Sequence, residues 1–277
     1  MIYGLKFVLK FALGLDIAGR NFAIFPDDTF VVSYPRSGNT WTRFLIANLV
    51  HPNEDVTFTN IERLIPDTSS QSSRALKRTP RPRIIKTHEY FDHKYGKVIY
   101  IVRDPRDVAL SYYDFQRKYR QIDDQYPLEN YVDDFVNGRL ISRGWGTWGE
   151  NVASWISTRG KSPNFLLVHY EDMTADTSRE LSRIAQFLGI EPSSALLHNA
   201  IARSTADRMR ELEKAQSGKW VATKNHRQDI PFIRSARSGG WREQLPERSI
   251  VQIESKWGEL MSTLGYELTS ANLCGTR

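Results

Sequence analysis

The chain alternates between short apolar runs and longer segments in which apolar residues recur every three to four positions. The short runs are rich in β-branched residues, which predicts strands buried on both faces of a sheet. They cover residues 29–33, 83–87, 97–102 and 165–168. The longer segments predict helices. They begin at Trp41, Pro105, Thr177, Ala195, Thr205 and Pro246. This alternation predicts an α/β fold, a doubly wound parallel sheet with helices on both faces and ligand sites at the carboxyl ends of its strands.

We expect a single domain covering residues 1–277. Three stretches within it depart from the alternation of strands and helices. Residues 51–83 are rich in turn formers and predict either an excursion over a site or a mobile loop. Residues 216–240 are polar, with few apolar anchors, and predict a flexible lid. Residues 121–159 are aromatic, and their rings are candidates either for the core or for the wall of an acceptor pocket. These rings belong to Tyr126, Tyr131, Phe135, Trp145, Trp148 and Trp155.

The N-terminal segment, residues 1–25, begins with an apolar run up to Leu15 that contains Lys6 and Lys10. This run is shorter than the ~20 residues needed to span a bilayer, and it shows no small-residue cleavage site of the secretory type. We expect a helix that packs on the domain. Peripheral membrane contact is the alternative, because basic residues among apolar ones also describe an interfacial helix.

Charge and cysteine content narrow the class of protein. Lys and Arg exceed Asp and Glu by 38 to 32, and the pI is about 9.3. This excess suits an anionic ligand, but the basic residues are dispersed and too few to predict a nucleic-acid partner. The one cysteine, Cys274, allows no disulfide within the chain. A reducing compartment is therefore favoured, and we expect a cytoplasmic protein.

Residues 34–41 join the first strand to the first helix and carry the strongest chemical signal. A turn at this place leaves the first N–H groups of the helix unpaired at the positive end of its dipole, which suits a phosphate. Gly38 allows close approach of the backbone. Ser37 and Thr40 add hydroxyl groups, and Arg36 adds a fixed charge. The loop therefore predicts a P-loop-like nucleotide-binding core.

This loop is not a Walker A motif. The pattern G-x-x-x-x-G-K-[ST] has a lysine where Asn39 stands, so binding of Mg-ATP is not predicted. For the loop taken alone, an ordinary turn between strand and helix is the alternative, and other segments have to decide.

Three further segments follow predicted strands and carry phosphate-binding or proton-transfer chemistry. Residues 86–88 read Lys-Thr-His, residues 103–112 read Arg-Asp-Pro-Arg-Asp and end in Ser-Tyr, and residues 234–241 end in Gly-Gly-Trp. Together with residues 34–41, they resemble the sulfotransferases that use 3′-phosphoadenosine 5′-phosphosulfate (PAPS). Residues 170–173, Tyr-Glu-Asp-Met, resemble a further segment of that family. The matches follow the family's order from about Phe30 to Leu260.

The resemblance implies how the chain would hold PAPS. The 5′-phosphate would be bound by Arg36, Ser37, Gly38, Asn39, Thr40 and Trp41. The 3′-phosphate would be bound by Arg103, Ser111, Arg234, Ser235, Ala236 and Arg237. The adenine would stack on Trp41 and form a hydrogen bond with Tyr170.

The resemblance also implies the reaction, in which a sulfuryl group passes from PAPS to a hydroxyl or amine. His88 would remove the acceptor's proton, for which an ordinary histidine pKa of ~6.5 is suited. Lys86 would contact the transferring sulfonate, and Arg36 would neutralise the charge that grows on the leaving group. No metal is expected. The acceptor is expected to be a small molecule, a glycan or a lipid.

Some residues depart from the family's pattern. Arg36 stands where the family usually has lysine, and Ala206 stands where a second aromatic ring commonly stacks on adenine. No segment after Trp241 matches the family's short dimer motif, so that dimer is not predicted. A nucleotide-dependent kinase with an atypical loop and a catalytically inactive nucleotide-binding module are the alternative functions.

Overall fold

The structure, a computed structural model, describes residues 13, 15–140, 144–234 and 236–269. The N-terminal helix or membrane contact expected for the first residues concerns mainly 1–12 and 14, which lie outside the described residues, as does Ser235. Within the described part of the chain, no helix has both the length and the apolar character needed to cross a membrane.

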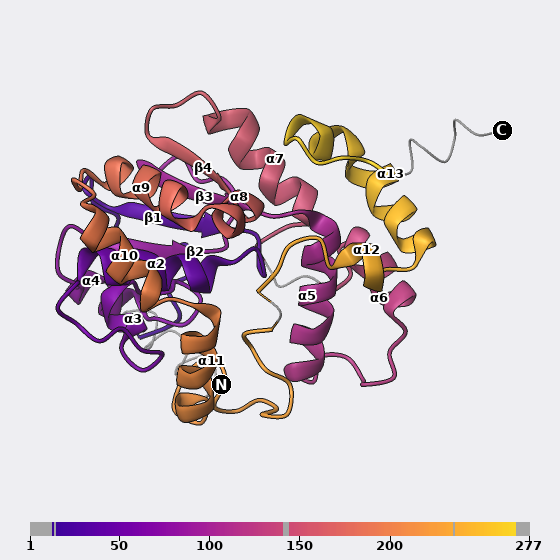
Figure 1. Ribbon diagram of the computed structural model, residues 1–277, viewed down its shortest axis with the longest axis horizontal. Coiled ribbons are helices and arrows are strands. Elements are labelled where there is room, and N and C mark those ends of the chain that lie inside the picture. The colour runs from indigo at the N-terminus through magenta and orange to yellow at the C-terminus, as the bar shows by residue number, and fades with distance from the viewer. Residues whose placement is uncertain (1–12, 14, 141–143, 235, 270–277) are drawn as a thin grey trace.

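A four-stranded parallel sheet forms the centre of the molecule (Figure 1). Its strands are β1 (Thr29–Ser33), β2 (Ile84–Thr87), β3 (Lys97–Val102) and β4 (Phe165–His169). They lie in the order β2-β1-β3-β4, and Val31 of β1 pairs with Lys86 on one side and Ile99 on the other. Because the strands are parallel, their carboxyl ends meet at one edge of the sheet.

Both faces of the sheet are apolar, as the continuous strand runs predict. Along β1, Phe30 and Val32 enter one hydrophobic core, and Val31 enters the other. Along β3, Tyr100 faces the first core and Ile99 the second. A sheet buried in this way needs helices on both sides.

The helices supply that cover and confirm the predicted α/β fold (Figure 1). One face is covered by α2 (Asn39–Val50), α3 (Ile61–Leu64), α9 (Thr177–Leu188), α10 (Ser194–Ala202) and α11 (Ala206–Gln216). The other is covered by α5 (Pro105–Lys118), α6 (Leu128–Val136), α7 (Trp148–Arg159) and α13 (Glu247–Thr263). Three further short helices are α4 (Ser73–Arg78), α8 (Tyr170–Ala175) and α12 (Trp241–Gln244).

Most of the aromatic rings of residues 121–159 belong to the core. Tyr131 and Phe135 of α6 and Trp148 and Trp155 of α7 are each at most 1% exposed and belong to the first core. The Phe135 and Trp148 rings contact Trp257 of α13. The interpretation of this segment as a pocket wall is therefore wrong for these four rings. Trp145 is the ring of the set that lines the cavity described below.

Residues 217–240 contain no helix or strand among those the structure describes, but they are better anchored than their sequence suggests. Trp220 is 3% exposed and meets the Phe232 ring edge to face, with centroids 4.9 Å apart. The Lys118 ammonium donates to the carbonyl oxygens of Arg227 and Ile230 at 2.7 and 2.6 Å. The Glu213 carboxylate accepts the N–H groups of Phe232 and Ile233. These distant partners explain why the local pattern showed few anchors, and the flexibility of the segment stays a prediction.

A buried ion pair fixes β2 to the start of β1. The guanidinium of Arg83 and the carboxylate of Asp28 are fully buried, and Nε donates to Oδ1 at 2.8 Å. The remaining nitrogens donate to the carbonyl oxygens of Leu76 and Ala23, each at 2.8 Å. The adjacent pair of Arg81 with Asp27 is exposed. The two pairs differ mainly in burial.

We predict that Asp28→Asn lowers the free energy of unfolding by about 3–5 kcal/mol, because the Arg83 charge stays buried without its counter-ion. Urea denaturation followed by circular dichroism measures this loss. Asp27→Asn is the matched control, and it should leave the unfolding midpoint unchanged because an exposed pair contributes little. Equal losses in the two variants would contradict the prediction.

Candidate active site

A cavity of about 860 Å³ opens at the carboxyl edge of the sheet, between α2, α5, α11 and residues 217–240. Most of the predicted site residues line it. They are Arg36, Gly38, Asn39, Thr40, Trp41, Lys86, His88, Arg103, Ser111, Tyr170, Arg234, Ala236 and Arg237. Ser37 differs, because it is 1% exposed and its N–H group donates to the Tyr34 carbonyl oxygen. Ser37 is therefore not among the residues that line the cavity, and its part in binding the 5′-phosphate stays a prediction.

The N-terminus of α2 opens into this cavity without a side-chain cap. The helix begins at Asn39, two residues earlier than its apolar pattern predicts, and Gly38 occupies the N-cap position with φ at 93°. A side chain is excluded at Gly38 for a second reason, because a Cβ atom there would lie 2.4 Å from the Tyr170 ring. The first turn thus offers unpaired N–H groups and the positive end of the helix dipole to an anion.

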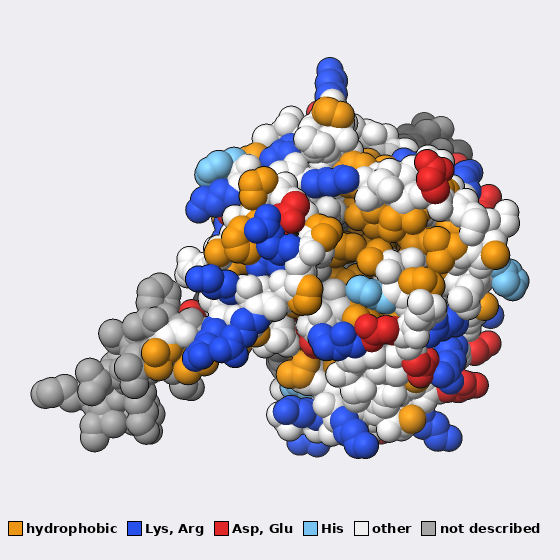
Figure 2. Space-filling view, turned by 90° about the vertical axis from the view of Figure 1, so that its left-hand side faces the viewer, with side chains coloured by type: hydrophobic (Ala, Val, Ile, Leu, Met, Phe, Trp, Pro, Cys, Tyr) orange, Lys and Arg blue, Asp and Glu red, His pale blue; other side chains and the backbone are white. Residues whose placement is uncertain are grey.

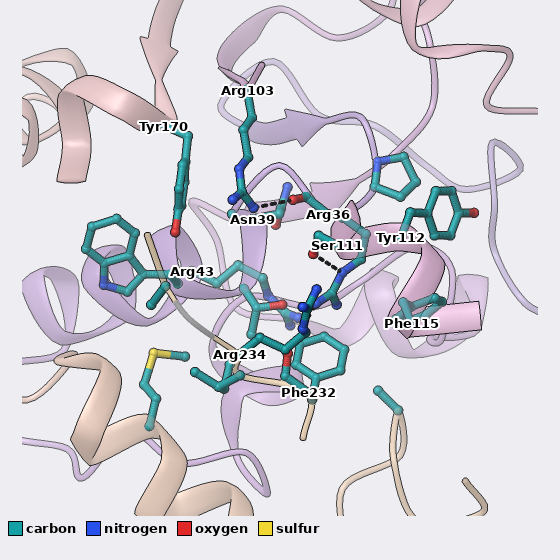
Figure 3. A pocket seen from close by; sticks show the side chains of 18 of the residues that line it. Arg36, Asn39, Arg43, Arg103, Ser111, Tyr112, Phe115, Tyr170, Phe232 and Arg234 are labelled. Atoms are coloured by element: carbon teal, nitrogen blue, oxygen red, sulfur yellow. Dashed lines mark hydrogen bonds between the residues drawn. The ribbon is translucent and has the colours of Figure 1, made fainter. Parts of the chain in front are cut away.

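Arg36 extends from the loop along one wall of the cavity (Figure 3). Its Nε donates to the Ser111 hydroxyl at 3.1 Å, and its Nη2 donates to the Phe232 carbonyl oxygen at 3.2 Å. The guanidinium lies over the rings of Phe115 and Phe232. Burial lowers the pKa of Arg36 to about 10, so it keeps its charge at neutral pH.

Two more arginines reach the same cavity from other elements (Figure 3). Arg103, after β3, lies over the Tyr170 ring and donates to the carbonyl oxygens of Arg36 and Arg237 at 3.3 and 3.0 Å. Arg234 donates to the Leu110 carbonyl oxygen and pairs with the Asp114 carboxylate at 2.5 Å. Guanidinium groups from three distant segments therefore surround one space, which suits a ligand with more than one phosphate.

Trp41 and Tyr170 form the side of the cavity opposite α5. The two rings meet edge to face, with centroids 5.9 Å apart. The indole Nε1 of Trp41 donates to the Ser204 carbonyl oxygen at 3.0 Å, which fixes the ring beside residues 204–206. Burial raises the pKa of Tyr170, so its hydroxyl stays protonated. This aromatic corner fits a purine base in shape and chemistry.

His88 follows β2 and lines the cavity. Its Nδ1 lies 2.8 Å from the Ser33 carbonyl oxygen. A carbonyl oxygen only accepts, so Nδ1 carries the proton and Nε2 keeps a lone pair. Burial and then the neighbouring Lys86 charge lower the pKa of His88 to about 3. The imidazole is therefore neutral at physiological pH, the state that a proton acceptor requires.

Sequence reasoning missed three charged residues of the cavity, Arg43, Glu62 and Asp67. Asp67 pairs with Lys86 at 2.7 Å, and Glu62 pairs with Arg43 at 3.2 Å. Residues 66–68 run along β2, because Lys86 N–H donates to the Pro66 carbonyl oxygen and Thr68 N–H to that of Lys86. Arg43 could have been singled out from the sequence, because it is a charged residue within the apolar pattern of α2. No sequence feature singles out Asp67.

The family model described as "Sulfotransferase domain" matches residues 26–265, most of the chain. This chain belongs to the sulfotransferase family. Sulfotransferase 1C2 of the rabbit is 27% identical over 82% of this chain and 80% of its own length. Rat sulfotransferase 1E1 is 29% identical over 82% of this chain and 81% of its own length. The assignment as a PAPS-dependent sulfotransferase, made from the residues at the strand ends, is confirmed at this level.

Solved structures share the fold of this sulfotransferase. Mouse sulfotransferase SULT7A1 complexed with PAP, the nucleotide that remains when PAPS loses its sulfuryl group, is 24% identical to this chain. Its TM-score is 0.66 over 87% of this chain and 86% of its own. A retinol dehydratase in a complex with retinol and PAP is 22% identical, with a TM-score of 0.75 over 88% of this chain and 84% of its own. Since one of these is a dehydratase, the shared fold alone does not decide the reaction.

We predict that Gly38→Ala weakens the binding of PAP to this sulfotransferase at least tenfold. The new Cβ must displace the Tyr170 ring and is strained at the positive φ, so the loop shifts away from the cavity. Isothermal titration calorimetry measures the affinity. Gly189→Ala is the matched control, because Gly189 also has a positive φ, at 79°, but no atom lies within 4 Å of its Cβ position. The prediction is contradicted if both variants bind PAP as the parent does.

Proposed function

We propose that this sulfotransferase passes a sulfuryl group from PAPS to a hydroxyl or amine of a small-molecule acceptor, with His88 as the general base. The observation that carries the proposal is the neutral imidazole of His88, which shares one cavity with the N-terminus of α2 and with Arg36. Two structural relatives are described in complexes with PAP, which supports PAPS as the donor. Androsterone and retinol, named with a retinol dehydratase, support a small organic acceptor.

The cavity offers one group of contacts to each end of the donor. The N–H groups at the start of α2 and the Arg36 guanidinium suit the 5′-phosphate. Arg103, Arg234 and the Ser111 hydroxyl suit the 3′-phosphate, and Trp41 with Tyr170 suits the adenine between them. Ala236 and Arg237 border the same space, and Ala236 has a positive φ of 51°.

In the proposed reaction, the acceptor oxygen forms a bond with sulfur while its proton passes to Nε2 of His88. The bond between sulfur and the 5′-phosphate oxygen breaks, and the electron pair stays on the phosphate. Arg36 and the α2 N-terminus neutralise that charge electrostatically, because an arginine is a poor proton donor. The Lys86 ammonium, with one hydrogen bond to Asp67, has further N–H groups for the sulfonate oxygens.

The two alternative functions lack comparable support. A kinase loop would have a lysine in place of Asn39. The Asn39 side-chain amide instead donates to the Ser33 hydroxyl at 3.1 Å and faces the sheet. An inactive nucleotide-binding module would not need the neutral His88 beside Lys86. Calorimetric titration separates the kinase, since tighter binding of Mg-ATP than of PAP would favour it.

We predict that His88→Ala lowers kcat by a factor of about 10² to 10⁴, because the acceptor's proton loses its base. The assay is transfer of ³⁵S from labelled PAPS to a panel of phenols, alcohols, glycosides and amines. PAP affinity should stay within threefold of the parent, since His88 makes no predicted donor contact. His93→Ala, at a histidine whose side chain is 81% exposed, is the control and should keep full activity. Undiminished turnover of the His88 variant removes it from the mechanism.

The lowered pKa of His88 predicts an unusual pH profile. A base with a pKa of about 3 is neutral from pH 5 upward, so kcat/KM for the acceptor should not fall as the pH drops from 8 to 5. An ordinary histidine would lose activity tenfold per pH unit below ~6.5. Initial rates in constant-ionic-strength buffers test this, with circular dichroism to confirm folding at each pH. An acid limb centred near 6.5 would contradict the prediction.

A further inference from the structure

One wall of the cavity near His88 is formed by charged and hydroxyl side chains that the donor does not need. Arg43 comes from α2, Glu62 from α3, and Asp67 and Ser70 from the stretch that follows α3. Arg43 and Asp67 are 2% and 8% exposed, so they lie in the interior rather than on a solvated surface. These four residues, together with Lys86, are called the polar wall below.

The polar wall is electrically balanced. Lys86 pairs with Asp67 at 2.7 Å, and Arg43 pairs with Glu62 at 3.2 Å. The Ser70 hydroxyl donates to Glu62 Oε2 at 3.2 Å, which leaves its own lone pairs for another donor. Asp67 Oδ1 already accepts the N–H and hydroxyl groups of Ser69, and Glu62 Oε2 also accepts the Asp67 N–H group. Asp67 Oδ2 and Glu62 Oε1 each face one cation and keep a lone pair, and the Arg43 Nε–H group has no hydrogen-bond partner. The wall therefore offers several hydrogen-bonding groups but no net charge.

Aromatic side chains line the same cavity as the polar wall. Trp145 packs edge to face against the His88 imidazole, with centroids 5.2 Å apart. Tyr112 and Phe115 of α5 line the same cavity, and Figure 3 shows both on the α5 side, beyond Arg36. An acceptor in this cavity would therefore meet both polar groups and aromatic rings.

We propose that the acceptor is a neutral polyhydroxylated ring, a sugar or a cyclic polyol, whose hydroxyl groups bind the polar wall while a C–H face packs on the aromatic rings. This inference rests on the proposed function, because it names the acceptor class of the same site. One ring hydroxyl is sulfated, and its neighbours exchange hydrogen bonds with Glu62, Asp67 and Ser70.

Other acceptor classes fit the polar wall less well. A phenol or sterol would remove water from the two ion pairs and return no hydrogen bonds, and buried polar groups left without partners cost affinity. An anionic acceptor would need a cation to spare, but Lys86 and Arg43 are already neutralised by Asp67 and Glu62. A neutral molecule with several hydroxyl groups meets both requirements.

The first experiment compares how well the 277-residue chain sulfates different candidate acceptors. The probes are methyl α-D-glucopyranoside, trehalose and myo-inositol, against 2-naphthol and D-glucuronate, each with ³⁵S-labelled PAPS. We expect kcat/KM for at least one neutral polyol to exceed that for 2-naphthol and glucuronate tenfold or more. Binding of the same probes to the complex with PAP is followed by saturation-transfer NMR, which detects millimolar affinities even where transfer is slow.

The second experiment alters the charge of the polar wall. Glu62→Gln keeps the size of the side chain but leaves the Arg43 charge without its partner. We expect the ratio of kcat/KM for glucuronate to that for the neutral glucoside to rise about tenfold, because a charge-assisted hydrogen bond becomes available. Glu54→Gln is the matched control, since Glu54 also pairs with an arginine, Arg63, but outside the cavity. A purely structural role of Glu62 would lower both activities and leave the ratio unchanged.

The outcomes separate the inference from the function on which it rests. If PAP binds and 2-naphthol is sulfated, but no polyol reacts or binds, the polyol assignment is overturned and the sulfotransferase activity stands. An unchanged glucuronate ratio in Glu62→Gln also overturns it. If PAP itself does not bind, the proposed donor is wrong, and the inference of a polyol acceptor fails together with the proposed function.

Discussion

The close contact between Gly38 and the Tyr170 ring is the constraint on which the site depends. A Cβ atom at Gly38 would lie 2.4 Å from that ring, so the loop after β1 and the helix after β4 fit together only when residue 38 has no side chain. The same ring carries the Arg103 guanidinium on its face and the Trp41 indole at its edge. One backbone approach therefore positions the α2 N-terminus, Arg103 and the aromatic corner of Trp41 and Tyr170 relative to each other. The parallel sheet makes this possible, because it delivers β1, β3 and β4 to a common edge.

Positive charge is concentrated in the cavity beyond what its carboxylates neutralise. Arg103 and Arg234 lower the pKa of Arg36, although burial is the larger cause. Arg36 itself is held by a hydroxyl group and a carbonyl oxygen rather than by a close carboxylate, and the Arg103 carboxylate partner, Asp107, is 3.8 Å away. Such an arrangement stores like-charge repulsion that an anionic ligand relieves. The donor's phosphates would thus be bound partly because they remove an unfavourable interaction of the unliganded protein, and the uncapped helix N-terminus adds to the same effect.

Most residues proposed to bind the donor line one cavity, and this grouping could be predicted from the sequence because the segments that carry them are local. The strand ends and the turn after β1 are short contiguous segments, and strand periodicity placed each of them at the same edge. Ser37 shows the limit of this reasoning, since only the fold reveals that its N–H group is used by Tyr34. The acceptor side could not be predicted in the same way. Asp67 becomes a partner of Lys86 only because residues 66–68 run beside β2. Trp148 and Trp155 were candidates for the pocket wall, but they are core residues because α13 and the sheet cover them. Both outcomes depend on long-range packing that no local pattern encodes.

The donor and acceptor sides of the cavity therefore differ in how much can be inferred about them from similarity to other sulfotransferases. The segments that match the family are those proposed to bind the nucleotide, and a retinol dehydratase with PAP shares the same fold at 22% identity. The residues proposed to face the acceptor come largely from the turn-rich stretch between α2 and β2 and from α5, where the fold sets the backbone but not the side chains. In this chain, those positions bring two neutralised ion pairs next to a histidine whose pKa is lowered to about 3. In the proposed reaction, Lys86 contacts the sulfonate while its partner Asp67 binds the acceptor. On that proposal, acceptor choice and catalysis are coupled through one ion pair, because a change at Asp67 also changes the partner of Lys86.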